Sequence, residues 1–196
     1  MTAFRNRRFL RMAGLCGVLA PVVCFGLIFY AISISPWFSW QTDALSDLGV
    51  YPRPSALWFN VALIAAGLLN VVLVLGIGHW LGPGWLGRAG TAVALVGVVA
   101  LGLIGVFPEN IRSPHWIAAA TYFLVTPFGY ALLGAELWRK GRRAHGAAVA
   151  ATALGAFLVM LYLPRDGLAV PEMIAGLLLS GPAFSTGIKL WLEGER

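Results

Sequence analysis

Ala56-Leu-Trp-Phe-Asn-Val-Ala-Leu-Ile-Ala-Ala-Gly-Leu-Leu-Asn-Val-Val-Leu-Val-Leu-Gly-Ile-Gly-His-Trp-Leu81 is a continuous apolar stretch that contains no Lys, Arg, Asp or Glu. A helix needs about 20 such residues to cross the hydrocarbon core of a bilayer. Because lipid offers the backbone no hydrogen-bond partners, a stretch of this kind satisfies its own N–H and C=O groups by forming a helix. The stretch therefore predicts a transmembrane helix over residues 56–81.

Five further stretches have the same character, and together they determine the predicted fold class. They cover residues 10–35, 86–107, 115–138, 145–163 and 170–192. Of the 196 residues in the chain, 59% are hydrophobic and only 11% are charged. Soluble domains carry about 25% charged residues, so this composition excludes an ordinary soluble protein. We predict an all-α integral membrane protein, a bundle of six transmembrane helices that forms a single domain over residues 1–196.

The Lys and Arg side chains are divided unevenly between the two ends of these helices. One side receives Arg5, Arg7, Arg8, Arg11, Arg88, Arg139, Lys140, Arg142, Arg143, Lys189 and Arg196, and the other receives only Arg53, Arg112 and Arg165. Cytoplasmic loops carry the excess of positive charge, which predicts a plasma-membrane protein with cytoplasmic N- and C-termini. The positive side also attracts anionic lipid headgroups. Membrane lipids are therefore the expected partners, and the net charge of +6 requires no nucleic acid.

The two cysteines, Cys16 and Cys24, both lie in the first apolar stretch. Eight residues of helix separate them by about 12 Å, which is beyond the reach of a disulfide within one chain. We interpret them as small apolar packing residues. The sequence leaves open whether the chain forms a homo-oligomer.

The three connections on the less basic side share one format. The first opens at Pro36 and closes at Pro54, the second runs from Pro108 to Pro114, and the third from Pro164 to Pro171. A closing proline suits the first turn of the next helix, where its missing N–H is not needed. Ser113 is the expected N-cap of the fourth helix. This format predicts three helical hairpins joined by short cytoplasmic turns.

The first of these connections carries the most informative polar pattern. Trp37 and Trp40 are amphipathic aromatic residues suited to the level of the lipid headgroups. The segment Asp43-Ala-Leu-Ser-Asp-Leu-Gly49 predicts a short helix that Asp43 caps and Gly49 terminates. On the plainest interpretation this is an interfacial loop helix with no role in chemistry.

Four side chains on the less basic side combine the residue types of a proton-transfer site, namely Asp47, Glu109, His115 and Glu172. Packing of the hairpins around a common axis would bring them together at the outer mouth of the bundle. A carboxylate–histidine cluster relays protons, activates water or holds a divalent cation. These four are our candidate catalytic residues. The helix dipole by itself also explains a carboxylate in the first turn of the sixth helix.

None of the familiar short catalytic or metal-binding motifs accompanies this cluster, because H-E-x-x-H, C-x-x-C and G-x-S-x-G are all missing from the sequence. Metal binding is left open, and no cofactor is predicted. The residues expected to contact a substrate are Trp37, Trp40, Asp43, Ser46, Asn60 and Trp116. Asn60 equally suits an interhelical hydrogen bond.

Several of these motifs occur together in one known family. The segments Asp43-Ala-Leu-Ser-Asp-Leu-Gly49, Phe59-Asn60, Gly105-Val-Phe-Pro-Glu109, His115 and Val170-Pro-Glu172 resemble the small prokaryotic membrane proteins catalogued as domain of unknown function 998. The resemblance covers nearly the whole chain and implies six helices. It singles out the same four candidate catalytic residues but implies no activity. A looser likeness to Frag1/DRAM/Sfk1-type membrane proteins points towards lipid handling.

Three functional hypotheses follow from these observations. The first is a protein that handles a lipid or small molecule at the outer carboxylate–histidine site, by hydrolysis or transfer if it is an enzyme. The second is a non-catalytic scaffold or lipid-binding module. The third is a small cation- or proton-coupled transporter. The predicted helix centres carry no ionisable side chain, which argues against this third hypothesis.

Overall fold

The structure is a computed structural model that describes residues 7–163 and 166–195. Arg5, Pro164, Arg165 and Arg196 lie outside the described residues. The described part contains helices and no strand, in the order α1 (Arg7–Ser33), η1 (Leu45–Gly49, a 3-10 helix), α2 (Ala56–Leu81), α3 (Trp85–Val106), α4 (Arg112–Arg139), α5 (Arg143–Tyr162) and α6 (Ala169–Glu195). All six α-helices are long and apolar enough to cross a membrane. The predicted all-α membrane fold is confirmed at this level.

The helix bounds follow the hydropathy pattern closely. α2 begins and ends where its apolar stretch does, whereas α1 begins at Arg7 and α4 at Arg112, each three residues earlier than expected. The difference has a simple cause. A long basic side chain extends its charged group towards the headgroups while its backbone continues the helix, so a charged residue does not mark the end of the helix. Ser113, the predicted N-cap, lies inside α4, and that prediction is wrong.

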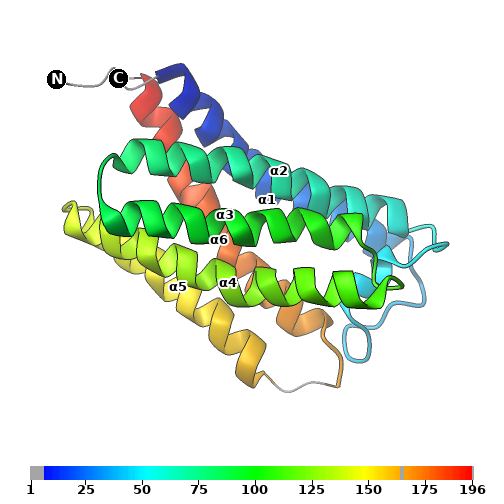
Figure 1. Cartoon of the computed structure of the whole chain (residues 1–196). Coiled ribbons are helices and arrows are strands. Elements are labelled where there is room, and N and C mark those ends of the chain that lie inside the picture. Colours follow the sequence, from blue (N-terminus) through cyan, green and yellow to red (C-terminus); the bar gives the residue numbers. More distant parts are fainter. Residues whose placement is uncertain (1–6, 164–165, 196) are drawn as a thin grey trace.

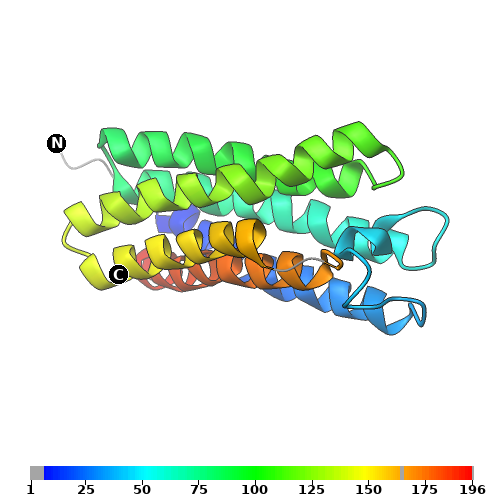
Figure 2. The ribbon, with the colours of Figure 1, turned by 90° about the horizontal axis from the view of Figure 1, so that it is seen from below.

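The six helices form a ring. Each helix packs beside its neighbours in the sequence, and α6 returns to pack along α1, as the two views in Figure 1 and Figure 2 show. The packing is most extensive between α3 and α4 and least extensive between α5 and α6. Contacts within the predicted hairpins are no more extensive as a group than contacts between them. The grouping into three hairpins therefore stays a prediction.

α1 and α6 touch backbone to backbone over part of their length. A Cβ atom added to Gly14 would lie 2.5 Å from the backbone nitrogen of Trp191, and one added to Gly17 would lie 2.9 Å from the carbonyl oxygen of Ala183. Only glycine allows helices to approach this closely. Towards the other end of the two helices, a Cβ on Gly176 would find only the ring of Phe25, at 3.7 Å. The two helices therefore separate along their length, as Figure 1 also shows.

The two ends of the ring differ in what they carry. Gly194 of α6 packs against Arg7 and Arg11 of α1, so both ends of the described chain lie at one end of the bundle, which we call the terminal end. The opposite end, which we call the site end, carries the 34–55 connection with η1 and the 107–111 connection.

Polar groups at the terminal end are paired with one another. The Trp80 indole N–H donates to Glu193 Oε2 at 2.5 Å, and the guanidinium of Arg142 donates to Glu193 Oε1 at 2.8 Å. The same guanidinium lies over the Trp80 ring, 3.8 Å from its centroid. This network joins α2 and α6 to the turn that precedes α5.

Candidate functional site

The 34–55 connection folds back over the site end and closes the ring. Leu48 of η1 is fully buried and Leu45 is nearly so. Ser55 Oγ donates to the Leu48 carbonyl at 2.8 Å, and Asn60 Nδ2 donates to the Gly49 carbonyl at 3.0 Å. η1 is therefore a plug held in place by α2 rather than a helix that floats at the membrane interface.

The cap of this short helix is not the one that the sequence suggested. η1 begins at Leu45 with Ala44 as its N-cap, and Asp47 Oδ2 accepts the Ala44 N–H at 2.8 Å. Asp43 instead accepts the N–H of Ser39 at 2.8 Å. The carboxylate three residues after the cap reaches back to it, as the acidic residue of a capping box does. The prediction that Asp43 caps the helix is wrong.

Carboxylates from three separate segments meet at η1. Glu172 Oε2, from the first turn of α6, accepts the Leu45 N–H at 2.8 Å. Glu109 Oε2, from the connection between α3 and α4, accepts the Ser46 hydroxyl at 2.7 Å. Asp47 belongs to η1 itself. The structure thus brings together the three carboxylates of the predicted cluster, and each of them also has a local partner in the plug.

His115, the fourth member of the cluster, is buried in the first turn of α4. Its Nδ1 lies 2.8 Å from the carbonyl oxygen of Phe107. A carbonyl oxygen only accepts, so Nδ1 carries the proton in this bond and the orientation of the ring is fixed. Among the described residues no partner binds Nε2. A histidine held in this way presents Nε2 as a base to whatever lies beside it.

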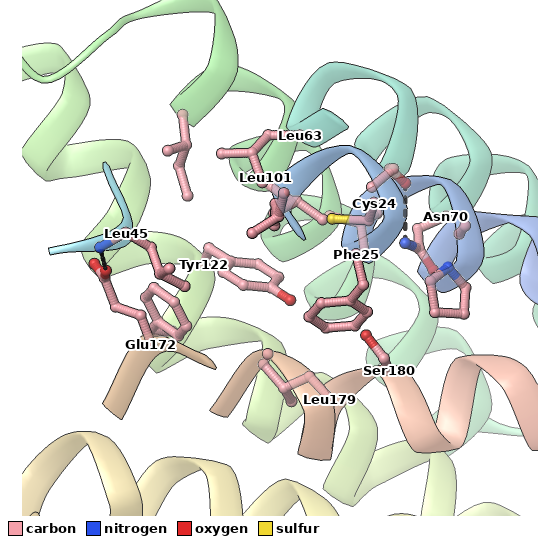
Figure 3. Close-up of a pocket in the computed structure, with 18 of the residues that line it drawn as sticks. Cys24, Phe25, Leu45, Leu63, Asn70, Leu101, Tyr122, Glu172, Leu179 and Ser180 are labelled. Atoms are coloured by element: carbon pink, nitrogen blue, oxygen red, sulfur yellow. Dashed lines mark hydrogen bonds between the residues drawn. The ribbon is translucent and has the colours of Figure 1, made fainter. Parts of the chain in front are cut away.

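A cavity runs down the centre of the ring beneath η1. Leu45, Ser46, His115 and Glu172 line its end beneath η1, and mostly apolar side chains of α1, α2, α3, α4 and α6 line the rest. Figure 3 shows Leu45 and Glu172 together at one end of this space. None of the lining residues comes from α5. This helix therefore packs outside the cavity wall.

A polar groove lies on the outer side of the same histidine. It is lined by Asp47, Val50, Arg53, Glu109, Asn110, Arg112, Ser113, His115, Trp116 and Ile117. Arg53 donates to the Asp47 carbonyl at 2.7 Å, and its guanidinium lies 3.9 Å from the centroid of the Trp37 ring. Among the described residues Arg112 forms no ion pair. His115 thus separates a charged groove from an apolar cavity, and the Ser46–Glu109 hydrogen bond lies at the same boundary.

An apolar groove continues from the polar one along the outside of α3 and α4. Leu103, Phe107 and Pro114 are among its lining residues, and Ile117 lines both grooves. Its other lining residues extend along the surface of the two helices and are Leu95, Val96, Val99, Ala100, Ala118 and Thr121. A charged groove above an apolar one matches the division of a lipid into headgroup and chain.

The predicted substrate-binding residues fall into two groups. Ser46 lines the cavity and Trp116 lines the polar groove. Trp37 packs under Arg53, Trp40 packs edge-on against Phe38, and Asp43 and Asn60 hold the 34–55 connection. These last four line neither space, and a binding role for them stays a prediction.

Sequence reasoning missed several residues of the site. It counted Arg53 and Arg112 only as charges for topology, and it gave Tyr122 no role. The sequence around an arginine or an aromatic residue does not show which cavity or groove its side chain will line. For metal binding, the described residues contain no group of three or more His, Cys, Asp and Glu side chains placed to hold an ion.

The fold and the site together define a polytopic membrane protein of six helices with a plugged, histidine-bordered cavity at one end. A family model described as "Protein of unknown function (DUF998)" matches residues 18–188, and the chain belongs to that family. The resemblance drawn from its motifs is confirmed. No curated protein and no solved structure matches the chain. The looser likeness to Frag1/DRAM/Sfk1-type proteins stays a prediction.

Proposed function

We propose that this protein handles a lipid of the outer leaflet, with His115 as the group that moves a proton. The observation that carries the proposal is that His115 lines a charged groove, which shares Ile117 with the apolar surface groove of α3 and α4. The uneven division of Lys and Arg supports an outward-facing site end, because the terminal end carries most of the positive charge.

The charges of the polar groove indicate the kind of headgroup. The groove carries two guanidinium groups, from Arg53 and Arg112, and two carboxylates, from Asp47 and Glu109. Guanidinium groups bind phosphate oxygens well, whereas carboxylates attract an ammonium group. A zwitterionic phospholipid headgroup complements both signs of charge. Its chain would follow the apolar groove from Ile117 along α3 and α4.

The chemistry available to the site is proton transfer. Phe107 holds the Nδ1–H of His115, which leaves Nε2 to take a proton from water or from a hydroxyl group. The oxygen activated in this way attacks an ester or phosphodiester bond of the lipid, and the imidazolium returns the proton to the leaving oxygen. Hydrolysis and group transfer differ only in whether water or another hydroxyl supplies the attacking oxygen.

A non-catalytic lipid-binding module is the second candidate. The observation that favours it is that Glu109 and Glu172 both bind donors of the plug, so these carboxylates have a structural use. On this alternative His115 only anchors the Phe107 carbonyl, and the polar groove binds a headgroup without changing it. A transporter stays a prediction, with no contact in the described residues that favours it.

The test compares total lipid extracts from cells that express the wild-type chain or His115→Ala at equal membrane abundance, with an empty-vector strain as the baseline. His145→Ala is the matched control, because His145 is also hydrogen-bonded, to Thr186 Oγ1 at 3.0 Å, but lies at the terminal end. We expect a lipid species to change in amount with the wild type and with His145→Ala, and to return to the baseline with His115→Ala.

Two results would contradict the enzymatic proposal. Lipid changes that persist in His115→Ala would remove the histidine from the chemistry. Profiles that coincide in all four strains, with retained binding of phosphatidylethanolamine by the purified protein, would leave the non-catalytic module as the function.

A further inference from the structure

The deep part of the central cavity contains polar groups that the protein leaves without partners. Tyr122 of α4 and Ser180 of α6 both line it, and Figure 3 shows both hydroxyl groups pointing towards its middle. Among the described residues neither hydroxyl forms a hydrogen bond. Buried polar groups of a folded protein are normally satisfied, so their combination here points to a ligand.

These groups lie well inside the membrane. Along the helices, Tyr122 is seven residues below His115 and Ser180 is eight below Glu172, which places them about 10 to 12 Å from the site end. The hydrocarbon core is about 30 Å thick, so this layer is near its middle. No Lys, Arg, Asp or Glu lines the cavity at this depth. An ion or a charged headgroup is costly there, and the ligand is therefore neutral.

The side chains that line the cavity at this depth indicate the chemical nature and shape of the ligand. Tyr122 and Ser180 offer O–H donors, which call for an acceptor such as a carbonyl oxygen. The rings of Phe25, Tyr122 and Phe123 line the same region, and aromatic faces stack well against a flat ring. Between these rings and the polar end beneath η1 the lining is mostly apolar, with the aliphatic side chains of Ile28, Leu63 and Ile104 among the residues. A flat ring with carbonyl oxygens and a hydrocarbon tail fits both parts.

The size of the cavity agrees with such an occupant. About 80 Å³ of it is wide enough for the centre of a water-sized molecule. One bound water needs only about 10 to 15 Å³ of such space and two to four polar partners. This cavity is several times larger, and most of its walls are apolar. Water alone would leave those walls poorly solvated, whereas an apolar molecule with a few acceptors satisfies them.

The ligand has a route from the bilayer. α1 and α6 are tightly packed at Gly14 and Gly17 but separate towards the site end. Phe25 of α1 and Gly176 of α6 line the cavity at this seam, and both are only half-buried. Pro21 and Pro182 remove a backbone hydrogen bond from each of the two helices near the point of separation. At this seam only side-chain contacts, such as that of the Phe25 ring with Gly176, separate the cavity from the bilayer, so a lipid-soluble molecule need not cross the plug.

We propose that the central cavity binds a neutral isoprenoid quinone, with its ring between Phe25 and Tyr122, its carbonyl oxygens bound by Tyr122 and Ser180, and its tail in the aliphatic part of the cavity. This site is separate from the polar groove and goes beyond lipid headgroup chemistry. It implies a protein that senses, stores or uses a membrane-borne carbonyl compound.

The experiment uses the purified full chain in detergent, titrated with a decyl-substituted benzoquinone and followed by quenching of its intrinsic tryptophan and tyrosine fluorescence. Tyr122→Phe and Ser180→Ala remove one hydroxyl each and keep the shape of the cavity. One hydrogen bond is worth about two- to tenfold in affinity, and we expect each variant to weaken binding by that factor. Tyr30→Phe, at an exposed position of α1, is the matched control and should bind like the wild type.

Three comparisons of binding affinity decide the proposal. Decanol, which has the chain but no carbonyl ring, is added as a competitor of the quenching quinone and should bind at least tenfold more weakly than the quinone. Equal binding of decanol, or unchanged quinone affinity in both hydroxyl variants, would overturn the assignment. Arg112→Ala, which alters only the polar groove, should leave quinone binding unchanged. Failure of this proposal is thereby distinguished from failure of the headgroup site, which the lipid extracts test through His115.

Discussion

Both ends of the bundle contain paired polar groups, but the site end and the cavity beneath it also leave some polar groups without a partner among the described residues. At the terminal end, Glu193 receives hydrogen bonds from both Trp80 and Arg142, and Lys140 lies 3.5 Å from Glu136. At the site end and in the cavity beneath it, His115 Nε2 and the Tyr122 hydroxyl have no partner among the described residues. Paired groups add stability, whereas unpaired ones reduce it unless a ligand completes them. The comparison indicates that the terminal end holds the ring together and that the site end binds.

The largest expected effect tests the close packing at the terminal end. In Gly14→Val the new Cβ would lie 2.5 Å from the backbone nitrogen of Trp191. A backbone atom of a packed helix cannot move aside as the end of a flexible side chain can. Overpacking of this kind costs about 3 kcal/mol, and we expect most of the purified protein to unfold or aggregate. Thermal denaturation in detergent measures the loss.

Gly26→Val is the control for this prediction, because nothing lies within 4 Å of a Cβ at Gly26, on the same helix but towards the site end. It should melt within a few degrees of the wild type. Equal melting temperatures for both variants would show that the α1–α6 crossing is not the tight contact described above.

A moderate effect is expected from Glu172→Ala, which leaves the Leu45 N–H without its acceptor. An unsatisfied buried donor costs about 1 to 3 kcal/mol. The loss should be local and should loosen η1 rather than unfold the ring. Hydrogen exchange should accelerate at residues 44–49 and stay unchanged in α2 beyond Asn60. Uniform acceleration in all helices would mean that the plug and the ring unfold as one unit.

The smallest effects compare one arginine at each end. Arg142→Ala removes an ion pair and a cation–π contact, but both partners are partly exposed, so we expect a loss of only about 1 kcal/mol. Arg112→Ala should not change stability measurably, and it should weaken binding of zwitterionic lipid severalfold. Chemical denaturation and lipid co-purification measure the two quantities. A loss of stability in Arg112→Ala and a loss of lipid binding in Arg142→Ala would contradict the roles assigned to the two ends.

The sequence predicted the helices well because their signal is local. Each helix in lipid needs its own apolar stretch, so the bounds of α2 can be read directly from residues 56–81. It also selected Asp47, Glu109, His115 and Glu172, whose residue types are expensive to place near a membrane without a use. The meeting of the three carboxylates at η1 required the ring, which no local pattern specifies.

The remaining features could not be predicted for a related reason. A membrane helix is apolar on every side, so no hydrophobic stripe shows which face lines a cavity. Tyr122 and Ser180 therefore looked like ordinary residues of their helices. The cap of η1 was predicted wrongly for a different reason. Asp43 and Asp47 are both residue types that can bind a free backbone N–H, and only the backbone path after Ser39 decides which of them binds Ala44.

The position of α5 outside the cavity wall has a practical consequence. This helix packs against α4 through small residues, such as Gly146 against Gly134, and it contributes nothing to the lining of the cavity. Leu154 and Leu158 on its surface are exposed. A fluorophore or spin label attached there through an introduced cysteine would report on the ring from outside, leaving both the plug and any bound molecule untouched.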